Sequence, residues 1–269
     1  MICTDLDGSL LDDQYRWSEA QPALDRIREK NIPLCLNTSK TFSEVQSLLK
    51  SLDLDTPAIC ENGGIIAIPL DSPLAAGLKG ATHCGYRLFY PGLDRRFLIQ
   101  IASDLRNANG YRFQGFSDLT ETELVQLTGL SPKEVLDAKC RHATEPIIWN
   151  DTPARRLAFT RELADHGIRL VQGGRFFHIM GQVDKSDGLS FLAHMYRKHW
   201  PLDSWTVIAL GDSANDLAML SAADIAGVIP DRKGNLLNPT APSVIRAQAS
   251  GPAGWNEIMQ QLFDHFGDP

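Results

Sequence analysis

The chain has 269 residues, of which 43% are hydrophobic and 22% charged, a length and composition that suit one large globular domain or two smaller ones. Its formal net charge of −7 argues against a nucleic-acid partner, because nucleic-acid phosphates need clustered Lys and Arg. No apolar run approaches the roughly 18 residues that cross a bilayer, which excludes a membrane-spanning protein. The five cysteines are widely spaced without a CxxC pair, so we expect a cytoplasmic protein with reduced thiols.

Short apolar runs alternate with helical patterns at both ends of the chain. At the amino-terminal end, strands are predicted at 1–4, 32–39 and 57–60, with helices at 19–31 and 41–53 between them. Near the other end, helices are predicted at 187–200 and 212–223, and strands at 204–210 and 225–230. Strand–helix–strand order with short connections predicts right-handed crossovers. We therefore expect an α/β fold: a Rossmann-like parallel sheet with helices on both faces.

The middle of the chain has a different pattern. Residues 113–139 read as two helices, whose starts are marked by capping boxes at Thr120 with Glu123 and at Ser131 with Glu134. Two strand-like runs then flank Gly173-Gly174, the spacing of a tight hairpin. These elements predict an α+β cap inserted at residues 87–180 into a catalytic core formed by residues 1–86 and 181–269.

Four loops of the predicted core carry residues suited to phosphate chemistry. Because ligands bind beyond the carboxyl ends of parallel strands, we expect these loops to meet at one place. They contribute Asp5 and Asp7, then Thr38, Ser39 and Lys40, then Lys185, and finally Asp212, Asn215 and Asp216. Carboxylates can hold Mg²⁺, while a lysine, a hydroxyl and helix amides can hold a phosphoryl group.

Asp5 and Asp7 lie two residues apart, and like charges so close disfavour each other unless a cation or a proton is shared. A magnesium ion would neutralise them and allow each to take a different role. Asp5 is nearer the strand and is the better candidate for a nucleophile that forms an aspartyl-phosphate. Asp7, on the turn, is the better candidate for the acid–base that protonates the leaving oxygen.

The sequence resembles the haloacid dehalogenase superfamily of phosphohydrolases in four motifs that occur in the family's order. These are DLDGSLL at 5–11, Thr38 at a strand end, Lys185, and GDSAND at 211–216. The resemblance implies that Asp5 is the nucleophile and Asp7 the acid–base, and that Thr38 and Lys185 hold the phosphate. It also implies a Mg²⁺ cofactor bound by Asp5, Asp212 and the backbone carbonyl of Asp7, with Asp216 in support.

Further segments resemble one branch of that superfamily, the mannosyl-3-phosphoglycerate phosphatases. The segments are NTSKT, ENGG, GFSDLT, LTGLS, EPIIW and QGGRFFHIMG, and they are spread over nearly the whole chain. This resemblance implies a small phosphorylated substrate, mannosyl-3-phosphoglycerate or its glucosyl analogue, whose product is a compatible solute.

Residues that would contact such a substrate are expected in both parts of the chain. An arginine suits the glycerate carboxylate, and Glu or Gln suits sugar hydroxyls. The candidates are Ser39, Lys40, Asn62 and Asn215 in the core and Arg141, Glu145, Gln172, Gly174, Arg175 and His178 in the cap. Arg175 and His178 have an odd separation on a predicted strand, so only one of them would face the substrate, and the pattern leaves open which. Thr38 and Ser39 could also cap the helix that follows them.

The motifs leave alternative functions open. A hexose-phosphate phosphatase or a phosphomutase could use the same core, because the core motifs do not distinguish water from a sugar hydroxyl as acceptor. A phospho-receiver module, which is not an enzyme, also combines an acidic cluster with Mg²⁺, a Thr or Ser and a Lys, but without a cap of this size. The sequence does not indicate an oligomeric state.

Overall fold

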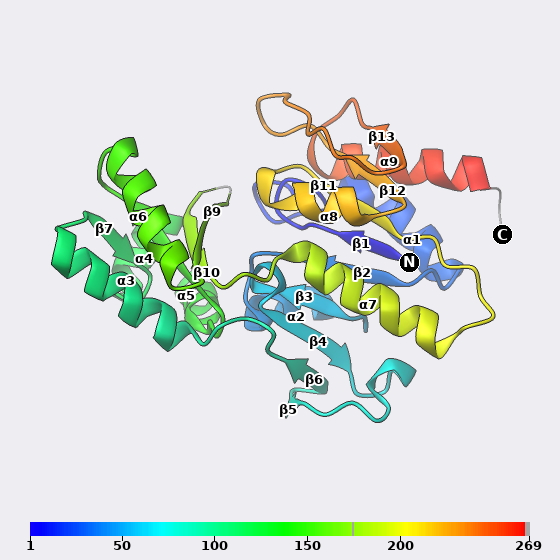
Figure 1. Ribbon diagram of the computed structural model, residues 1–269. Coiled ribbons are helices and arrows are strands. Elements are labelled where there is room, and N and C mark those ends of the chain that lie inside the picture. Colours follow the sequence, from blue (N-terminus) through cyan, green and yellow to red (C-terminus); the bar gives the residue numbers. More distant parts are fainter. Residues whose placement is uncertain (174, 267–269) are drawn as a thin grey trace.

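The computed structural model describes residues 1–173 and 175–266, and its larger part is built on a nine-stranded sheet (Figure 1). In spatial order the strands are β13 (Ser243–Arg246), β12 (Ile225–Val228), β11 (Ile208–Gly211), β1 (Ile2–Thr4), β2 (Leu34–Asn37), β3 (Ala58–Cys60), β4 (Ile65–Pro69), β6 (Tyr86–Phe89) and β5 (Ala81–His83). The strands from β13 across to β3 are parallel to one another, whereas β4, β6 and β5 continue the sheet in antiparallel fashion.

Helices cover both faces of this sheet. One face packs against α1 (Gln21–Glu29), α2 (Phe42–Ser51) and α9 (Gly251–Phe266), through side chains such as Leu24, Val45 and Ile258. The other face packs against α7 (Lys185–His199) and α8 (Leu217–Ala222). Short 3-10 helices occupy Ser18–Ala20, Glu61–Gly63, Pro73–Ala75 and Ala214–Asp216. The prediction of an α/β fold with a parallel-rich sheet and helices on both faces is confirmed.

A second, four-stranded antiparallel sheet has the order β7-β8-β10-β9. Its strands are part of a group of elements comprising α3 (Arg95–Asn109), β7 (Phe113–Gly115), α4 (Glu121–Thr128), α5 (Pro132–Lys139), β8 (Thr144–Trp149), α6 (Pro153–Asp165), β9 (Arg169–Gln172) and β10 (Phe177–Met180). We call the elements from α3 to β10 (residues 95–180) the cap and the rest of the chain the core. The cap, green in Figure 1, lies at the end of the core sheet toward which β1 and β2 point.

One face of the cap sheet is buried under α3 and α6. Ile147 and Ile179 of the sheet pack there against Leu98 of α3 and Phe159 of α6. Thr120 and Ser131 cap the N-termini of α4 and α5 with the capping boxes that the sequence predicts. Helices α4 and α5 cover part of the opposite face, through Leu124 and Val135 packed near Ile148.

Several local expectations need correction. Strand β6 pairs with β4 in the core sheet although it straddles the predicted boundary at residue 87, and the division into domains stays a prediction. Neither α3 nor the antiparallel strands β4 to β6 were predicted from the sequence. Strand β9 ends at Gln172 and β10 begins at Phe177, so their connection is longer than the predicted two-glycine turn. In the described residues, no helix has the length and apolarity that crossing a membrane requires.

Candidate active site

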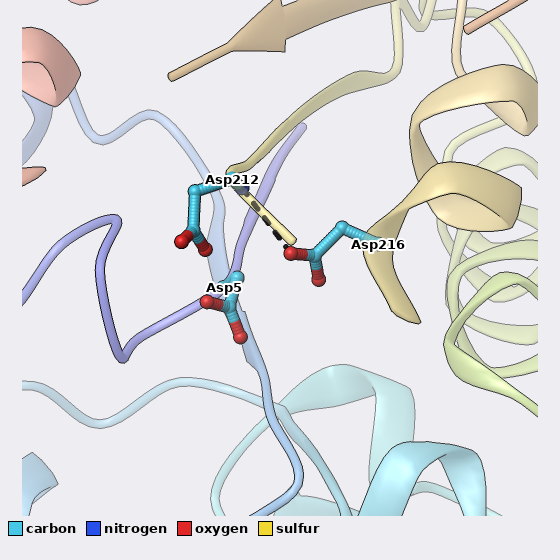
Figure 2. Close-up of side chains that lie close together, drawn as sticks. All are labelled: Asp5, Asp212 and Asp216. Carbon is cyan, nitrogen blue, oxygen red and sulfur yellow. Dashed lines mark hydrogen bonds between the residues drawn. The ribbon is translucent and has the colours of Figure 1, made fainter. Parts of the chain in front are cut away.

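Three carboxylates meet at the carboxyl ends of the two neighbouring strands β1 and β11. Asp5 follows β1, Asp212 follows β11, and Asp216 closes the 3-10 turn that comes next. Figure 2 shows the three side chains gathered around one point, and one oxygen from each lies within 4.8 Å of the others. Parallel pairing of β1 with β11 thus joins residues more than 200 positions apart in the sequence.

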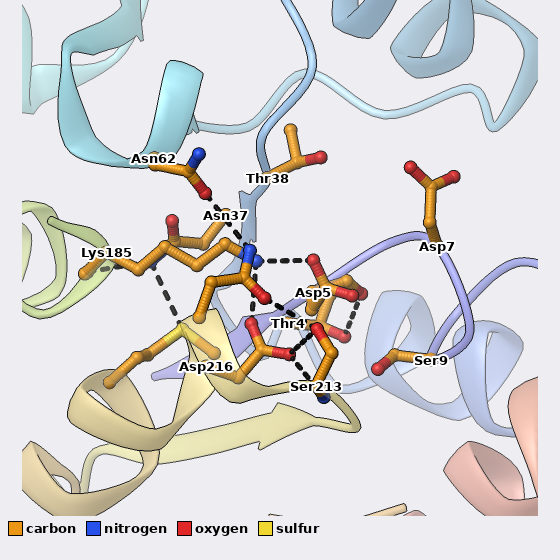
Figure 3. Close-up of polar contacts among 12 residues, drawn as sticks. Thr4, Asp5, Asp7, Ser9, Asn37, Thr38, Asn62, Lys185, Ser213 and Asp216 are labelled. Carbon is orange, nitrogen blue, oxygen red and sulfur yellow. Dashed lines mark hydrogen bonds and ion pairs between the residues drawn. The ribbon is translucent and has the colours of Figure 1, made fainter. Parts of the chain in front are cut away.

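Lys185 enters the same cluster from the first turn of α7. Its fully buried ammonium lies 2.5 Å from Asp5 Oδ1 and 2.6 Å from Asp216 Oδ1 (Figure 3). The second oxygen of Asp216 accepts hydrogen bonds from the backbone N–H groups of Asp212 and Ser213. Asp216 therefore fixes both Lys185 and the loop that carries Asp212.

Two motif glycines make this close approach possible. Gly8 has φ +86°, and a Cβ on it would lie 2.5 Å from Asp212 Oδ2. A Cβ on Gly211 would lie 2.6 Å from the Cβ of Asp216. The glycines in DLDG and GDSAND are thus explained by the space that the neighbouring aspartates occupy.

The electrostatics of the cluster follow from its burial. Burial raises the pKa of Asp5 well above its usual value, the charge of Asp216 raises it further, and Lys185 opposes both effects. The pKa of Asp212 is raised to about 7 by burial and then by Asp216. Burial disfavours the charged form of Lys185, but the charges of Asp216 and Asp5 outweigh it and raise the pKa of the ammonium. Lys185 therefore stays charged while the carboxylates crowd one another.

This donor set fits a magnesium ion. Mg²⁺ prefers oxygen ligands and is usually bound by one or two carboxylates together with waters. Lys185 balances part of the charge of Asp5 and Asp216, whereas Asp212 accepts a 3.3 Å hydrogen bond from the Ser9 hydroxyl and forms no ion pair among the described residues. Asp5 and Asp212 therefore offer the carboxylate oxygens best placed for a cation.

The predicted phosphate-binding residues surround this cluster (Figure 3). Thr38 is buried at the end of β2, and its hydroxyl accepts a hydrogen bond from the backbone N–H of Lys40 at 3.2 Å. The following helix is capped by Thr41 in a capping box with Glu44, so the suggestion that Thr38 or Ser39 caps it was wrong. The hydroxyl of Thr38 therefore has no part in capping that helix.

Two asparagines brace the same region. Asn37 donates from Nδ2 to the backbone carbonyl of Lys185 at 2.9 Å, which ties β2 to the start of α7. Asn62 adopts φ 55° and accepts a hydrogen bond from Asn215 at 3.1 Å, while its own buried Nδ2 has no hydrogen-bond partner among the described residues. The candidates Asn62 and Asn215 thus lie together on the side of the site that carries Lys185.

Asp7 lies apart from the three clustered carboxylates. Its side chain, 45% exposed, points away from Asp5 in Figure 3 and forms an ion pair of 3.0 Å with Lys40. The ammonium of Lys40 lies 4.3 Å from the centre of the Tyr15 ring. Burial disfavours its charge, but Asp7 and Glu44 outweigh burial and raise the pKa of Lys40. Neither this pair nor the position of Tyr15 was predicted from the sequence.

Two buried side chains connect the core to the cap. Glu61 of the core has φ 51°, and its carboxylate accepts hydrogen bonds from the backbone N–H groups of His142 and Ala143 and from the Thr144 hydroxyl. In the opposite direction, Arg141 of the cap donates to the carbonyl of Ser39 at 3.1 Å. The segment 141–144 is thus held against the core loop that carries Thr38 and Ser39. Sequence reasoning missed Glu61, whose only signal was its place in ENGG.

The remaining cap candidates do not converge. Glu145 is buried, forms an ion pair with Arg95 and accepts a hydrogen bond from the backbone N–H of Ser117. Gln172, by contrast, is exposed. Arg175 donates to the carbonyls of Leu127 and Thr128 at the end of α4. Gly174 lies outside the described residues.

His178 is the cap candidate that is buried on the sheet face opposite to α3 and α6. It pairs directly with Val171, so the two side chains share a face. Burial first, and then the charges of Arg141 and Lys185, lower the pKa of His178 to about 3, so the imidazole is neutral. Its Nδ1 has no hydrogen-bond partner among the described residues.

A cavity of about 340 Å³ opens beside Lys185 between the core and the cap. Its lining includes Asn62, Lys185 and Asn215 of the core and Arg169, Val171 and Met180 of the cap. The cap side chains that reach this space therefore come from β9 and β10, on the same face as His178. Arg169 and Val171 were not among the sequence-based candidates.

Comparison with known proteins adds independent findings. The family model described as haloacid dehalogenase-like hydrolase matches residues 2–76 and 159–231. A protein of Methanococcoides burtonii named glucosyl-3-phosphoglycerate/mannosyl-3-phosphoglycerate phosphatase is 35% identical over 97% of this chain and 96% of its own length. A protein of Persephonella marina with the same name is 32% identical, over 98% of this chain and 97% of its own.

Solved structures share the architecture. The crystal structure of Thermoplasma acidophilum 0175 has a TM-score of 0.66 at 17% identity and covers 98% of this chain and 96% of its own. A sugar phosphatase of HAD subclass IIB has a TM-score of 0.63 at 15% identity, with 99% of this chain and 98% of its own covered. At these identities the likeness concerns the fold.

Proposed function

The chain belongs to the haloacid dehalogenase-like hydrolases, and from that premise we propose that it hydrolyses mannosyl-3-phosphoglycerate or its glucosyl analogue in the presence of Mg²⁺. Its relatives over nearly the full length are named phosphatases, and the chain is a phosphoric monoester hydrolase. The observation that carries the proposal is the cluster of buried Asp5 and Asp216 with half-buried Asp212 and with Lys185 at the carboxyl edge of the sheet.

In the proposed reaction, a carboxylate oxygen of Asp5 attacks phosphorus and the bond from phosphorus to the leaving oxygen breaks. Asp7 gives its proton to that oxygen, and the glycosylglycerate leaves. Asp7 then takes a proton from a water molecule that attacks the aspartyl-phosphate, which releases phosphate and restores Asp5. Thr38 and Lys185 hold the phosphoryl oxygens during both steps.

A bound Mg²⁺ would offset the negative charge that collects on the phosphoryl oxygens. The residues that would hold it are Asp5, Asp212 and the backbone carbonyl of Asp7, with Asp216 in support. Lys185 supplies a fixed positive charge beside the nucleophile, and its ion pairs keep the Asp5 carboxylate oriented.

The choice of sugar is assigned to the cap, because phosphate and metal are common to all substrates of the core. The cavity beside Lys185 is lined by Arg169, Val171 and Met180 of the cap, so these cap side chains are available to contact a polar group of the substrate there. A cytoplasmic location belongs to the same proposal, supported by five cysteines that are free thiols.

The test is phosphate release from mannosyl- and glucosyl-3-phosphoglycerate and from common hexose phosphates, each with Mg²⁺ and with a chelator. We expect the glycosyl phosphoglycerates to be hydrolysed fastest and only with Mg²⁺, and the Asp5→Asn variant to be inactive. Faster release from a hexose phosphate would favour the sugar-phosphatase alternative. Transfer of phosphate to an added hexose phosphate would favour a phosphomutase, and phosphorylation of Asp5 without turnover a receiver module.

A further inference from the structure

We propose that Lys40 binds a carboxylate carried by the leaving group, so that the core itself selects phosphate esters of hydroxy acids. The inference rests on the proposed function and deepens it, because it places part of the substrate selection outside the cap. It concerns a residue that touches the leaving group rather than the phosphate or the metal.

The position of Lys40 carries the argument. Lys40 lies two residues after Thr38, and its backbone N–H donates to the Thr38 hydroxyl at 3.2 Å. Its ammonium extends to Asp7, 3.0 Å from Oδ2. Asp7 is the group assigned to protonate the leaving oxygen. The ammonium of Lys40 would therefore be separated from that oxygen only by the Asp7 carboxyl group. In a 3-phosphoglycerate, one carbon separates the carboxylate from the phosphorylated carbon, which brings the carboxylate close to the same oxygen.

The surroundings of Lys40 fix the position of its ammonium group and leave N–H donors of that group available. The side chain is 13% exposed, and the ring of Tyr15 covers it at 4.3 Å. Among the described residues, Asp7 Oδ2 is the only oxygen in hydrogen-bond or ion-pair contact with the ammonium. An ammonium has three N–H donors, so it can bind a second carboxylate without leaving Asp7. A carboxylate bound there would also meet a cation that is already largely desolvated.

The arginines that could compete for this role already donate to other groups of the protein, although the buried Nε of Arg141 has no partner among the described residues. Arg141, which the sequence suggested for the glycerate carboxylate, donates to Ser39 O and to the Thr144 hydroxyl. Arg175 is bound to carbonyl groups at the end of α4. Arg95 is paired with a buried cap glutamate. Lys40, by contrast, forms its ion pair with the half-exposed carboxylate of Asp7, the residue assigned to protonate the leaving oxygen.

Equilibrium binding tests the inference without turnover. In an Asp5→Asn background with Mg²⁺ present, calorimetry would compare 3-phosphoglycerate with glycerol 3-phosphate, which has a hydroxymethyl group in place of the carboxylate. We expect tighter binding of 3-phosphoglycerate, and we expect Lys40→Gln to reduce the ratio of the two dissociation constants roughly tenfold to a hundredfold, the range for a lost hydrogen bond to a charged group. Lys40→Arg keeps the charge and should retain most of the preference. Lys50→Gln, at the exposed end of α2, is the matched control and should leave the ratio unchanged.

Two results would overturn the inference. One is equal binding of both ligands before Lys40 is changed, and the other is an equal loss for both ligands in Lys40→Gln. Retained binding of glycerol 3-phosphate by Lys40→Gln shows that the variant is folded. Failure of the proposed function appears elsewhere, as absence of phosphate release from glycosyl-3-phosphoglycerates, because the binding pair contains no sugar.

Discussion

Replacing Lys185 by methionine should strongly destabilise the folded protein, because it removes the cation that separates two buried carboxylates. Methionine has similar length and fills the space without the charge. Asp5 and Asp216 would then be two neighbouring buried carboxylates with no counter-charge.

The expected magnitude follows from the contacts. Lys185 makes two ion pairs, of 2.5 and 2.6 Å, and a hydrogen bond to a charged group contributes about 1.5–3 kcal/mol. Breaking a buried pair by removing one partner costs about 3–5 kcal/mol, which agrees with two such contacts. We therefore expect the free energy of unfolding to fall by about 3–5 kcal/mol at neutral pH.

The loss should depend on pH. Without Lys185 the pKa of Asp5 rises further, so the folded state keeps a proton that the unfolded chain, with an aspartate pKa of about 3.9, releases. A group whose pKa is raised by folding contributes stability below its unfolded pKa and loses it as the pH rises through its folded pKa. Asp212, whose pKa is about 7 in the folded protein, already makes the free energy of unfolding of the unmodified protein decrease with rising pH in the same way. Because Asp212 contributes to both proteins, the difference between variant and unmodified protein should come mainly from Asp5 and grow as the pH rises above the unfolded aspartate pKa of about 3.9.

Urea unfolding in the presence of a chelator, at several pH values, measures this difference. Lys198→Met, on the exposed face at the far end of α7, is the matched control and should change the free energy of unfolding by less than about 0.5 kcal/mol. A loss below about 1 kcal/mol that does not vary with pH would show that Lys185 does not neutralise the buried carboxylates, and the electrostatic account of the site would be wrong.

Three further substitutions test other parts of the site. Asp7→Asn should slow hydrolysis of esters with poor leaving groups roughly 10²–10⁴-fold and of aryl phosphates much less; equal losses in kcat would count against its acid–base role. Gly8→Ala forces a left-handed φ at a cost of about 1–2 kcal/mol and pushes Asp212, so Mg²⁺ affinity measured by activity titration should fall; an unchanged affinity would contradict this account. Glu61→Ala should speed amide hydrogen exchange at residues 142 and 143, and unchanged exchange would show that Glu61 does not hold the cap loop.

The parts of the site that could be predicted are those encoded over short stretches. DLDG and GDSAND each set a turn directly after a buried strand, and the rule that ligands bind at the carboxyl ends of parallel strands then brings Asp5 and Asp212 together. The structure does bring them together, with Lys185 between Asp5 and Asp216. Their catalytic roles stay predictions.

The parts that escaped prediction depend on contacts between distant segments. Glu61 accepts hydrogen bonds from His142 and Thr144, which are 81 and 83 positions further along the chain. Nothing in the sequence next to Glu61 indicates a buried carboxylate. The cap on α2 was misassigned by a few residues, because Thr38, Ser39 and Thr41 all have side chains that can cap a helix. Strands β4 to β6 do not follow the strand–helix–strand order from which the parallel part of the sheet was predicted.

The cap arginines show why residue type alone could not identify specificity. A guanidinium binds a substrate carboxylate and a backbone carbonyl with the same donors, so Arg141 and Arg175 looked equally suited to glycerate. In the folded chain both donate to carbonyl groups of the protein, and releasing them for a ligand would leave those carbonyls unpaired. A side chain that keeps free hydrogen-bonding capacity beside the site carries no such cost. Lys40 and the neutral imidazole of His178, whose Nδ1 has no partner among the described residues, meet that condition, so selectivity is best sought at these two positions first.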